Sequence, residues 1–246
     1  MSDTIDPLRD AVVAAIACVV IVAAAIAFAG RARAEMGPCQ PDKFEGLTCG
    51  SGPGAARIIA DTLSPTQELG FAWRNPNTAP TDEQEDETLD LLLVRLKDGE
   101  VLAKGKTEYW NNGEMHANRR SEDVSWSPDG TLAVRALQLR FNTSAFELYV
   151  LGHAKPVIID LLKIVEPAVR AKMKVPKAEA DRWVLSVFGR DNLTISNNGI
   201  IRFRVTMWVP KDGPEKPFDI ALRLSENDKK QLAVRVTSIT AGKDPE

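Results

Sequence analysis

The residues of this chain best suited to chemistry lie together in one predicted loop, Glu108–Glu122. The candidate ligand-binding side chains there are Tyr109, Trp110, Asn112, His116, Arg119 and Arg120. Aromatic rings beside an amide suit stacking and hydrogen bonding to a sugar, and paired arginines suit a carboxylate or a phosphate. In the competing interpretation, Trp110 packs in the core and the arginines pair with neighbouring glutamates.

Catalytic and metal-binding motifs are missing from the sequence. It contains no nucleophile elbow, phosphate-binding loop, dinucleotide fingerprint or His-Glu-x-x-His zinc motif. His116 and His153 are the only two histidines, which excludes a histidine-rich metal centre. The acidic run Asp82–Glu87 does not follow the spacing of a calcium-binding loop, and we interpret it as a solvated loop. We therefore expect no catalytic residue, no metal ion and no cofactor.

Composition limits the class of partner. The formal net charge is −3 and the pI is about 5.6, which argues against a nucleic-acid-binding protein because phosphate neutralisation needs a basic face. Hydrophobic residues make up 44% and charged residues 26% of the chain, as in an ordinary globular protein. The expected partner is an unidentified protein or cell-envelope polymer, and a homodimer is an alternative assembly.

The N-terminal residues indicate export. Ala11–Ala29 is an uninterrupted apolar run, and Ala32-Arg33-Ala34 provides an A-x-A cleavage site. We expect a signal peptide over residues 1–34 that is cleaved before Glu35, and a periplasmic or secreted protein. The alternative is an uncleaved inner-membrane anchor formed by residues 11–29, because the run is long enough to span a bilayer and the first ten residues are not basic.

Cys39 and Cys49 are the only cysteines that follow the predicted cleavage site. Their spacing matches neither a redox C-x-x-C motif nor a zinc knuckle, and no histidine lies nearby. In an oxidising compartment this pair predicts one structural disulfide that closes a short loop.

A serine-containing turn occurs three times along the chain. The best-defined copy is Trp126-Ser127-Pro128-Asp129-Gly130, whose proline, aspartate and glycine favour a tight turn between two strands. Similar patterns surround Ser64 and Ser196, so the three serines are 63 and 69 residues apart. This motif resembles the repeat of TolB-type β-propellers, in which such a turn joins two strands of each blade. The resemblance implies blade-like units, but a closed propeller needs about four blades. An open stack, a sandwich of hairpins, or a ring completed by a partner subunit are the alternatives.

Hydrophobic patterns predict the elements that position these motifs. Over Leu132–Phe141 the apolar phase slips once, which predicts a bulge or a strand buried on both faces, with Arg135 on the polar side of the alternation. Ile200–Val209 alternates cleanly and predicts a strand with one wet face that carries Arg202, Arg204 and Thr206. Leu161–Lys174 changes to a helical period, and because proline is tolerated only in a first turn, we place the helix start near Glu166.

Together these features predict a mainly β protein of antiparallel, blade-like hairpin repeats, about three in number, with one short helix. The predicted segments are a signal peptide (1–34), a cysteine-containing lead-in (35–62), two blade-like units (63–162), a helical connector (163–182), a C-terminal β unit (183–240) and a tail (241–246). We expect a non-catalytic secreted or periplasmic protein that binds or scaffolds. A cell-envelope hydrolase that acts on a polysaccharide or peptide through carboxylates or His116 is the alternative, since carboxylate pairs leave no local signature.

Overall fold

The structure, a computed structural model, is mainly β with antiparallel strand pairing and contains one α-helix in the part that it describes. All of this part belongs to one unit, Glu35–Glu246. The predicted leader, the whole acidic run Asp82–Glu87 and all the candidate ligand-binding residues lie outside the described residues. The described residues are 36–81, 89–107, 121–139, 142–187, 189, 192–211, 213–229 and 231–242.

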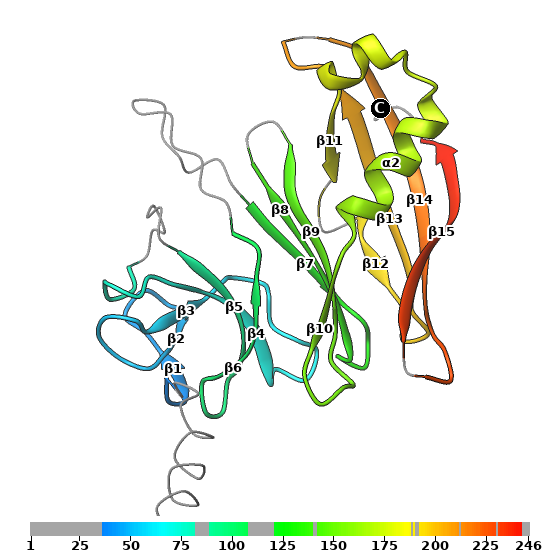
Figure 1. Ribbon diagram of the computed structural model, residues 1–246. Coiled ribbons are helices and arrows are strands. Elements are labelled where there is room, and N and C mark those ends of the chain that lie inside the picture. Colours follow the sequence, from blue (N-terminus) through cyan, green and yellow to red (C-terminus); the bar gives the residue numbers. More distant parts are fainter. Residues whose placement is uncertain are drawn as a thin grey trace, which may run out of the picture. The chain divides into compact units, whose positions relative to one another are not determined.

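Six strands form the first sheet, and each pairs antiparallel with its neighbour in sequence (Figure 1). They are β1 (Cys39–Pro41), β2 (Leu47–Cys49), β3 (Ala56–Ile58), β4 (Leu69–Arg74), β5 (Asp90–Arg95) and β6 (Glu100–Gly105). Leu91 and Leu93 of β5 face one hydrophobic cluster, and Leu92 and Val94 face another. Burial on both faces explains why β5 is a continuous apolar run without alternation.

The second sheet has four strands in the order β10-β9-β8-β7. Their bounds are β7 (Ser121–Trp126), β8 (Leu132–Gln138), β9 (Thr143–Val150) and β10 (Val157–Asp160). Six consecutive residues of β8, from Leu132 to Leu137, are buried, and the register shifts between Leu137 and Gln138. The predicted irregularity is therefore confirmed as both a bulge and a strand buried on two faces.

The third sheet follows the order β11-β13-β14-β15, and β12 also pairs with β13. The strands are β11 (Val184–Val187), β12 (Thr194–Ile195), β13 (Ile200–Trp208), β14 (Glu215–Glu226) and β15 (Leu232–Ala241). On β13, Ile201 and Phe203 are buried while Arg202 is exposed, so the predicted wet face is confirmed there. It does not extend to Thr206, which is buried. None of the three sheets closes on itself.

The helix α2 (Leu162–Met173) begins four residues before the predicted start at Glu166. Pro167 therefore lies inside the helix, where its missing N–H removes one backbone hydrogen bond. Burial of Val165 and Val169 against the core offsets this cost, because each fully buried valine contributes about 1.5–3 kcal/mol. A 3₁₀ segment, Lys177–Arg182, follows the helix.

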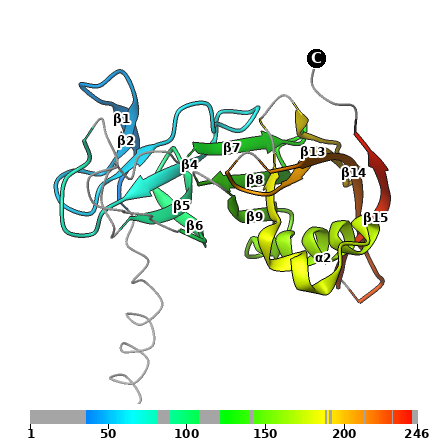
Figure 2. The ribbon, with the colours of Figure 1, turned by 90° about the horizontal axis from the view of Figure 1, so that it is seen from above.

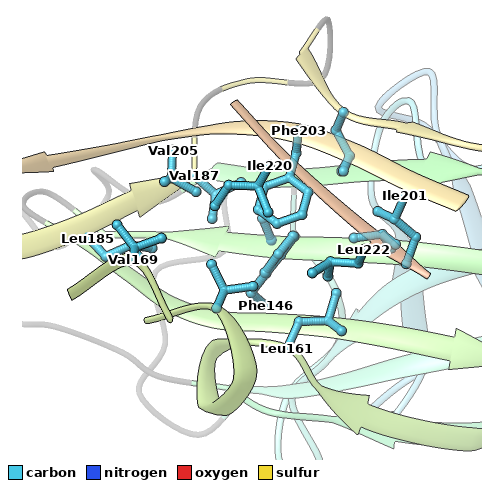
Figure 3. Close-up of a cluster of buried hydrophobic side chains, with 14 of the residues drawn as sticks. Phe146, Leu161, Val169, Leu185, Val187, Ile201, Phe203, Val205, Ile220 and Leu222 are labelled. Carbon is cyan, nitrogen blue, oxygen red and sulfur yellow. The ribbon is translucent and has the colours of Figure 1, made fainter. Parts of the chain in front are cut away.

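Two hydrophobic clusters hold the three sheets together. The larger cluster joins one face of the second sheet to α2 and to the inner face of the third sheet; Phe146 and Phe203 meet there edge to face at 4.8 Å (Figure 3). The other joins the opposite face of the second sheet to the first sheet through Phe71, which contacts Tyr149 edge to face. In both ribbon views the second sheet accordingly lies between the other two (Figures 1 and 2).

The three serine turns have the same hydrogen bonds. In the turn between β7 and β8, the Ser127 N–H donates to Leu132 O (2.9 Å), the Leu132 N–H donates to Ser127 Oγ (2.9 Å), and the Gly130 N–H donates to Ser127 O (2.9 Å). The corresponding bonds of Ser64, between β3 and β4, have lengths of 2.9, 3.1 and 2.9 Å. Those of Ser196, between β12 and β13, have lengths of 3.0, 3.2 and 2.9 Å.

These turns also lie at one end of the sheets, where they contact each other. The Trp126 Nε1–H donates to Thr62 O across the first two sheets (3.0 Å), and the Asp129 N–H donates to Asn197 Oδ1 across the second and third sheets (3.1 Å). The sequence similarity of the three segments thus corresponds to a similar turn between two consecutive antiparallel strands, one such turn in each sheet.

The predicted disulfide is confirmed: Cys39 and Cys49 are bonded and lie opposite each other on β1 and β2. Replacing both cysteines with serine should lower the free energy of unfolding by about 2–3 kcal/mol, because the bond restricts a short loop in the unfolded chain. Urea denaturation of the oxidised protein and of the C39S/C49S variant measures the difference. Equal unfolding midpoints and slopes would contradict the expectation.

Candidate functional site

The six candidate ligand-binding residues all fall in segment 108–120, outside the described residues. The structure does describe the residues on either side of this segment. Gly105 ends β6 in the first sheet, and Ser121 begins β7 in the second. The segment therefore connects a strand of the first sheet to a strand of the second sheet.

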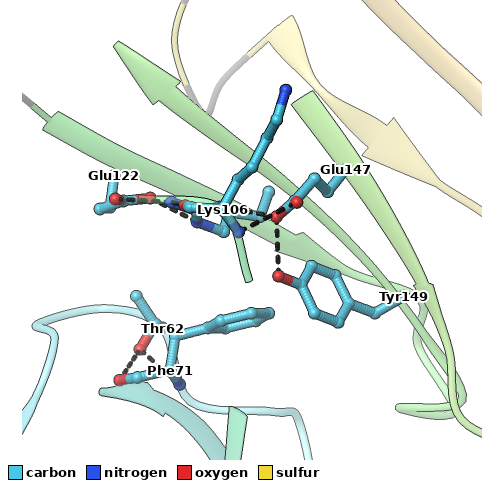
Figure 4. A network of polar contacts seen from close by, with 7 residues as sticks. Thr62, Phe71, Lys106, Glu122, Glu147 and Tyr149 are labelled. Atoms are coloured by element: carbon cyan, nitrogen blue, oxygen red, sulfur yellow. Dashed lines mark hydrogen bonds and ion pairs between the residues drawn. The ribbon is translucent and has the colours of Figure 1, made fainter. Parts of the chain in front are cut away.

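Arg135, in the middle of β8, holds both ends of segment 108–120. Its Nε and Nη2 donate to the two carboxylate oxygens of Glu122, at 2.7 and 3.0 Å, and Nη2 also donates to Lys106 O at 2.9 Å (Figure 4). The Arg135 side chain is fully buried, with 0% of its surface exposed. One guanidinium thus fixes a residue just before the segment and a residue just after it.

Glu147 completes this buried network from β9, where it lies opposite Arg135 in the strand register. Its Oε2 accepts hydrogen bonds from Arg135 Nη1 (2.7 Å) and from the Tyr149 hydroxyl (2.8 Å), and its Oε1 accepts one from the Lys106 N–H (3.1 Å). Every charged group of the network therefore has partners, as buried charges require. The prediction that Arg135 lies on a polar strand face is wrong: it is buried between two sheets.

The electrostatics of the network favour its charged form. Burial alone would lower the pKa of Arg135, but the carboxylate of Glu122 raises it above its usual value. Burial raises the pKa of Tyr149, so its hydroxyl keeps its proton and donates to Glu147. Gly105 contributes by having no side chain, because a Cβ there would collide with the Tyr149 hydroxyl.

Partly buried ion pairs lie at the same end of the sheets. Asp90 on β5 pairs with Arg74 (2.7 Å) and with Lys104, and Lys106 lies 3.6 Å from Asp160 at the end of β10. Arg74 and Asp90 are register partners at the ends of β4 and β5, and they are the strand residues that border the acidic run. The acidic run and segment 108–120 are therefore both connected to this end of the first sheet, opposite the serine turns.

A second candidate feature is an open cavity of about 680 Å³ on the first sheet, which sequence reasoning missed. Its apolar lining residues are Phe44, Leu47, Ile58, Ile59, Leu63 and Trp73. Its volume is within the range of small-molecule sites. Its wall combines the hairpin that the disulfide closes with residues 57–63 and Trp73, which are separate in the sequence, so no local sequence pattern indicated it.

Asp42 shapes the wall of this cavity by holding the turn between β1 and β2. Its Oδ1 accepts hydrogen bonds from the N–H groups of Phe44 and Gly46, both 2.9 Å long. Its Oδ2 accepts hydrogen bonds from the Thr48 hydroxyl (2.9 Å) and from Arg57 Nε (3.0 Å). Burial alone would raise the pKa of Asp42, but these four donors lower it to about 2.

The described residues include no group of three or more histidine, cysteine, aspartate or glutamate side chains placed to hold a metal ion. Within the same residues, no helix is both long and apolar enough to cross a bilayer, and the predicted apolar run 11–29 lies outside them. The chain matches no family model and no curated protein.

Replacing Arg135 with methionine should lower the free energy of unfolding by about 3–5 kcal/mol, because Glu122 and Glu147 would remain buried without their cation. Thermal or urea denaturation measures the loss. The matched control is R204M, which removes an arginine from the exposed pair with Asp219 and should leave the midpoint nearly unchanged. Similar effects of the two substitutions would contradict the importance of the buried network.

Asp42 should make the protein sensitive to acid. Because its pKa is depressed in the folded state, its ionised form stabilises the fold above the unfolded value of 3.8, and this stability is lost as the pH falls towards about 2. The difference in unfolding free energy between the wild type and D42N should shrink by about 2 kcal/mol from pH 6 to pH 2. Urea denaturation at a series of pH values tests this, and a difference that does not change with pH would refute it.

Proposed function

We propose that this chain is a non-catalytic secreted or periplasmic protein that binds or scaffolds a cell-envelope polymer or protein through segment 108–120. The observation that carries the proposal is the buried Arg135, whose guanidinium donates to Glu122 and to the carbonyl of Lys106. Binding residues are commonly found on connections positioned by a rigid scaffold. Burial of an arginine costs desolvation free energy. We infer that this cost is tolerated because the positions of Lys106 and Glu122, on either side of the segment, matter to function.

Three blade-like units, one for each sheet, provide the scaffold in this proposal. Its support is the repeated hydrogen-bond pattern of Ser64, Ser127 and Ser196, each at a turn between two consecutive antiparallel strands of a different sheet. In such an arrangement the connections between units lie at the end opposite the serine turns. Segment 108–120 is the connection between the first and second units, and the proposal assigns ligand binding to its aromatic and arginine residues.

Export is the second part of the proposal, with cleavage before Glu35. The disulfide between Cys39 and Cys49 supports it, since such bonds form and persist in oxidising compartments. The denatured mass of protein recovered from the periplasm should correspond to a chain that starts at Glu35 and has lost two hydrogens at the cysteines. A mass that includes residues 1–34 would instead favour the anchored form.

Co-sedimentation with purified peptidoglycan sacculi tests the binding function. We expect the wild-type protein to sediment with the sacculi and the W110A/R119A variant to lose at least about tenfold in affinity, the equivalent of one strong contact. The control variant R182A/V157A removes an exposed arginine and an exposed valine from described residues elsewhere and should bind normally.

Two results would count against this proposal. Equal sedimentation of the wild type and W110A/R119A would show that segment 108–120 is not the binding surface. Release of soluble fragments from the sacculi, lost in an H116A variant, would show that the chain is a hydrolase and not a non-catalytic binder.

A further inference from the structure

The outer face of the third sheet carries a row of arginines that the fold itself does not require. Residues 201, 203, 205 and 207 of β13 face the core, so the alternate residues, including Arg202, face away from the second sheet. Arg202, Arg223 and Arg235 are all exposed on this outer face. Among the described residues no ion pair joins any of these three side chains to a carboxylate.

The strand register brings the three arginines together. Arg223 on β14 lies directly opposite Arg235 on β15, and Arg202 lies diagonally across from Arg223, because its own partner on β14 is Ala221. Directly opposed side chains are about 5 Å apart at Cβ and diagonal neighbours about 7–8 Å apart. The three guanidinium groups therefore form one diagonal row across three strands.

Like charges placed directly opposite each other on a sheet are destabilising. The same face shows that the sheet can neutralise an arginine when a carboxylate is placed opposite it: Arg204 lies opposite Asp219, and its Nε donates to Asp219 Oδ1 at 2.8 Å. Arg223 has Arg235 at the corresponding place. A local arrangement that costs stability without a structural compensation is expected at a functional site.

A shallow hollow of about 270 Å³ lies beside the row and adds hydrogen-bonding groups to it. Its lining includes Arg202, Ser238, Thr240 and Asn192, together with the Arg204–Asp219 pair. Both oxygens of Asp219 face Arg204, at 2.8 and 3.3 Å, so this carboxylate is already neutralised. An anionic group in the hollow would meet the cation of Arg202 beside hydroxyl and amide groups.

We propose that this face binds a linear polymer that carries carboxylate or phosphate groups along its length, through Arg202, Arg223 and Arg235. Guanidinium groups bind both kinds of anion in a bidentate manner, and a row of three suits an anion that repeats along a chain. Stacking of nucleic-acid bases is not favoured, because Trp208, the aromatic residue of β13 on this face, is half-buried and donates to Ser186 Oγ (3.0 Å).

A membrane surface is the other large anionic partner, and the face fits it less well. Among the described residues, Val157 is the large hydrophobic side chain that is exposed, and it belongs to β10 of the second sheet. The arginine row therefore has no neighbouring exposed apolar side chain that would insert between lipids, which surface-binding elements normally provide. The proposal accordingly commits to a polymer in solution or in the cell envelope.

The test uses fluorescently labelled polyphosphate and polygalacturonate as two separate probes, with the mature protein titrated into each at 50 mM and 200 mM salt. Polyphosphate isolates the phosphate chemistry and polygalacturonate the carboxylate chemistry. We expect the protein to bind at least one of them, with an affinity that falls about twentyfold between the two salt concentrations if three charges are neutralised. The R202Q/R223Q/R235Q variant should bind at least about tenfold more weakly at 50 mM salt.

The matched control is K97Q/K155Q/K172Q, which changes the net charge equally at three exposed lysines that lie outside the third sheet. It should retain wild-type affinity. The triple arginine variant should fold normally, because it removes the repulsion between Arg223 and Arg235, and circular dichroism checks this. If the lysine and arginine variants lose affinity equally, net charge alone is responsible and the proposed face is wrong.

Two further arms complete the test. Failure of the wild type to bind either polymer overturns the proposal, as does binding only to vesicles that contain anionic phosphatidylglycerol. The inference rests on the proposed function in that both describe a non-catalytic binder, but it uses a different surface. The two proposals fail separately, because co-sedimentation of W110A/R119A with sacculi tests segment 108–120, whereas titration of R202Q/R223Q/R235Q with the two polymers tests the arginine face.

Discussion

The buried guanidinium of Arg135 is the interaction on which the junction of the first two sheets depends. An ion pair of this kind adds little net stability compared with an apolar core of the same shape, since both charges must leave water. Its main contribution is to fix the positions of the strand ends around it. Arg135 can satisfy its donors only when Glu122, Glu147 and the Lys106 carbonyl lie around it, so the end of β6 and the start of β7 have one permitted arrangement.

Of the three described sheets, the second is the one that packs against another sheet on each face, and both of its faces therefore carry large apolar side chains. One face contributes Phe146 to the larger core, and the other places Tyr149 against Phe71 of the first sheet. Because both faces are covered, the sheet has no room for a water-exposed charge in its middle. Arg135 is therefore acceptable there only with complete pairing. This requirement links the packing of the sheets to the positions of Lys106 and Glu122, which flank segment 108–120.

Short-range patterns predicted the parts of the fold that short-range interactions determine. The Ser127 turn, the disulfide and the wet face of β13 each depend on neighbouring residues and were readable from the sequence. The role of Arg135 was not, because its partners come from three other strands or their ends and an arginine in an alternating strand normally faces water. The helix start differed because tertiary burial outweighed the local cost of Pro167.

Arginine thus has two roles in this chain, and comparing them shows why a net charge is a poor guide to binding. Arg135 is buried with two carboxylates, whereas Arg223 is exposed opposite another arginine. A chain with a formal charge of −3 can still present a locally basic face, because the charges of carboxylates elsewhere are screened within about 8 Å at physiological salt. The net charge therefore argues against nucleic-acid binding by the surface as a whole. It does not prevent one face of a single sheet from attracting a smaller polyanion.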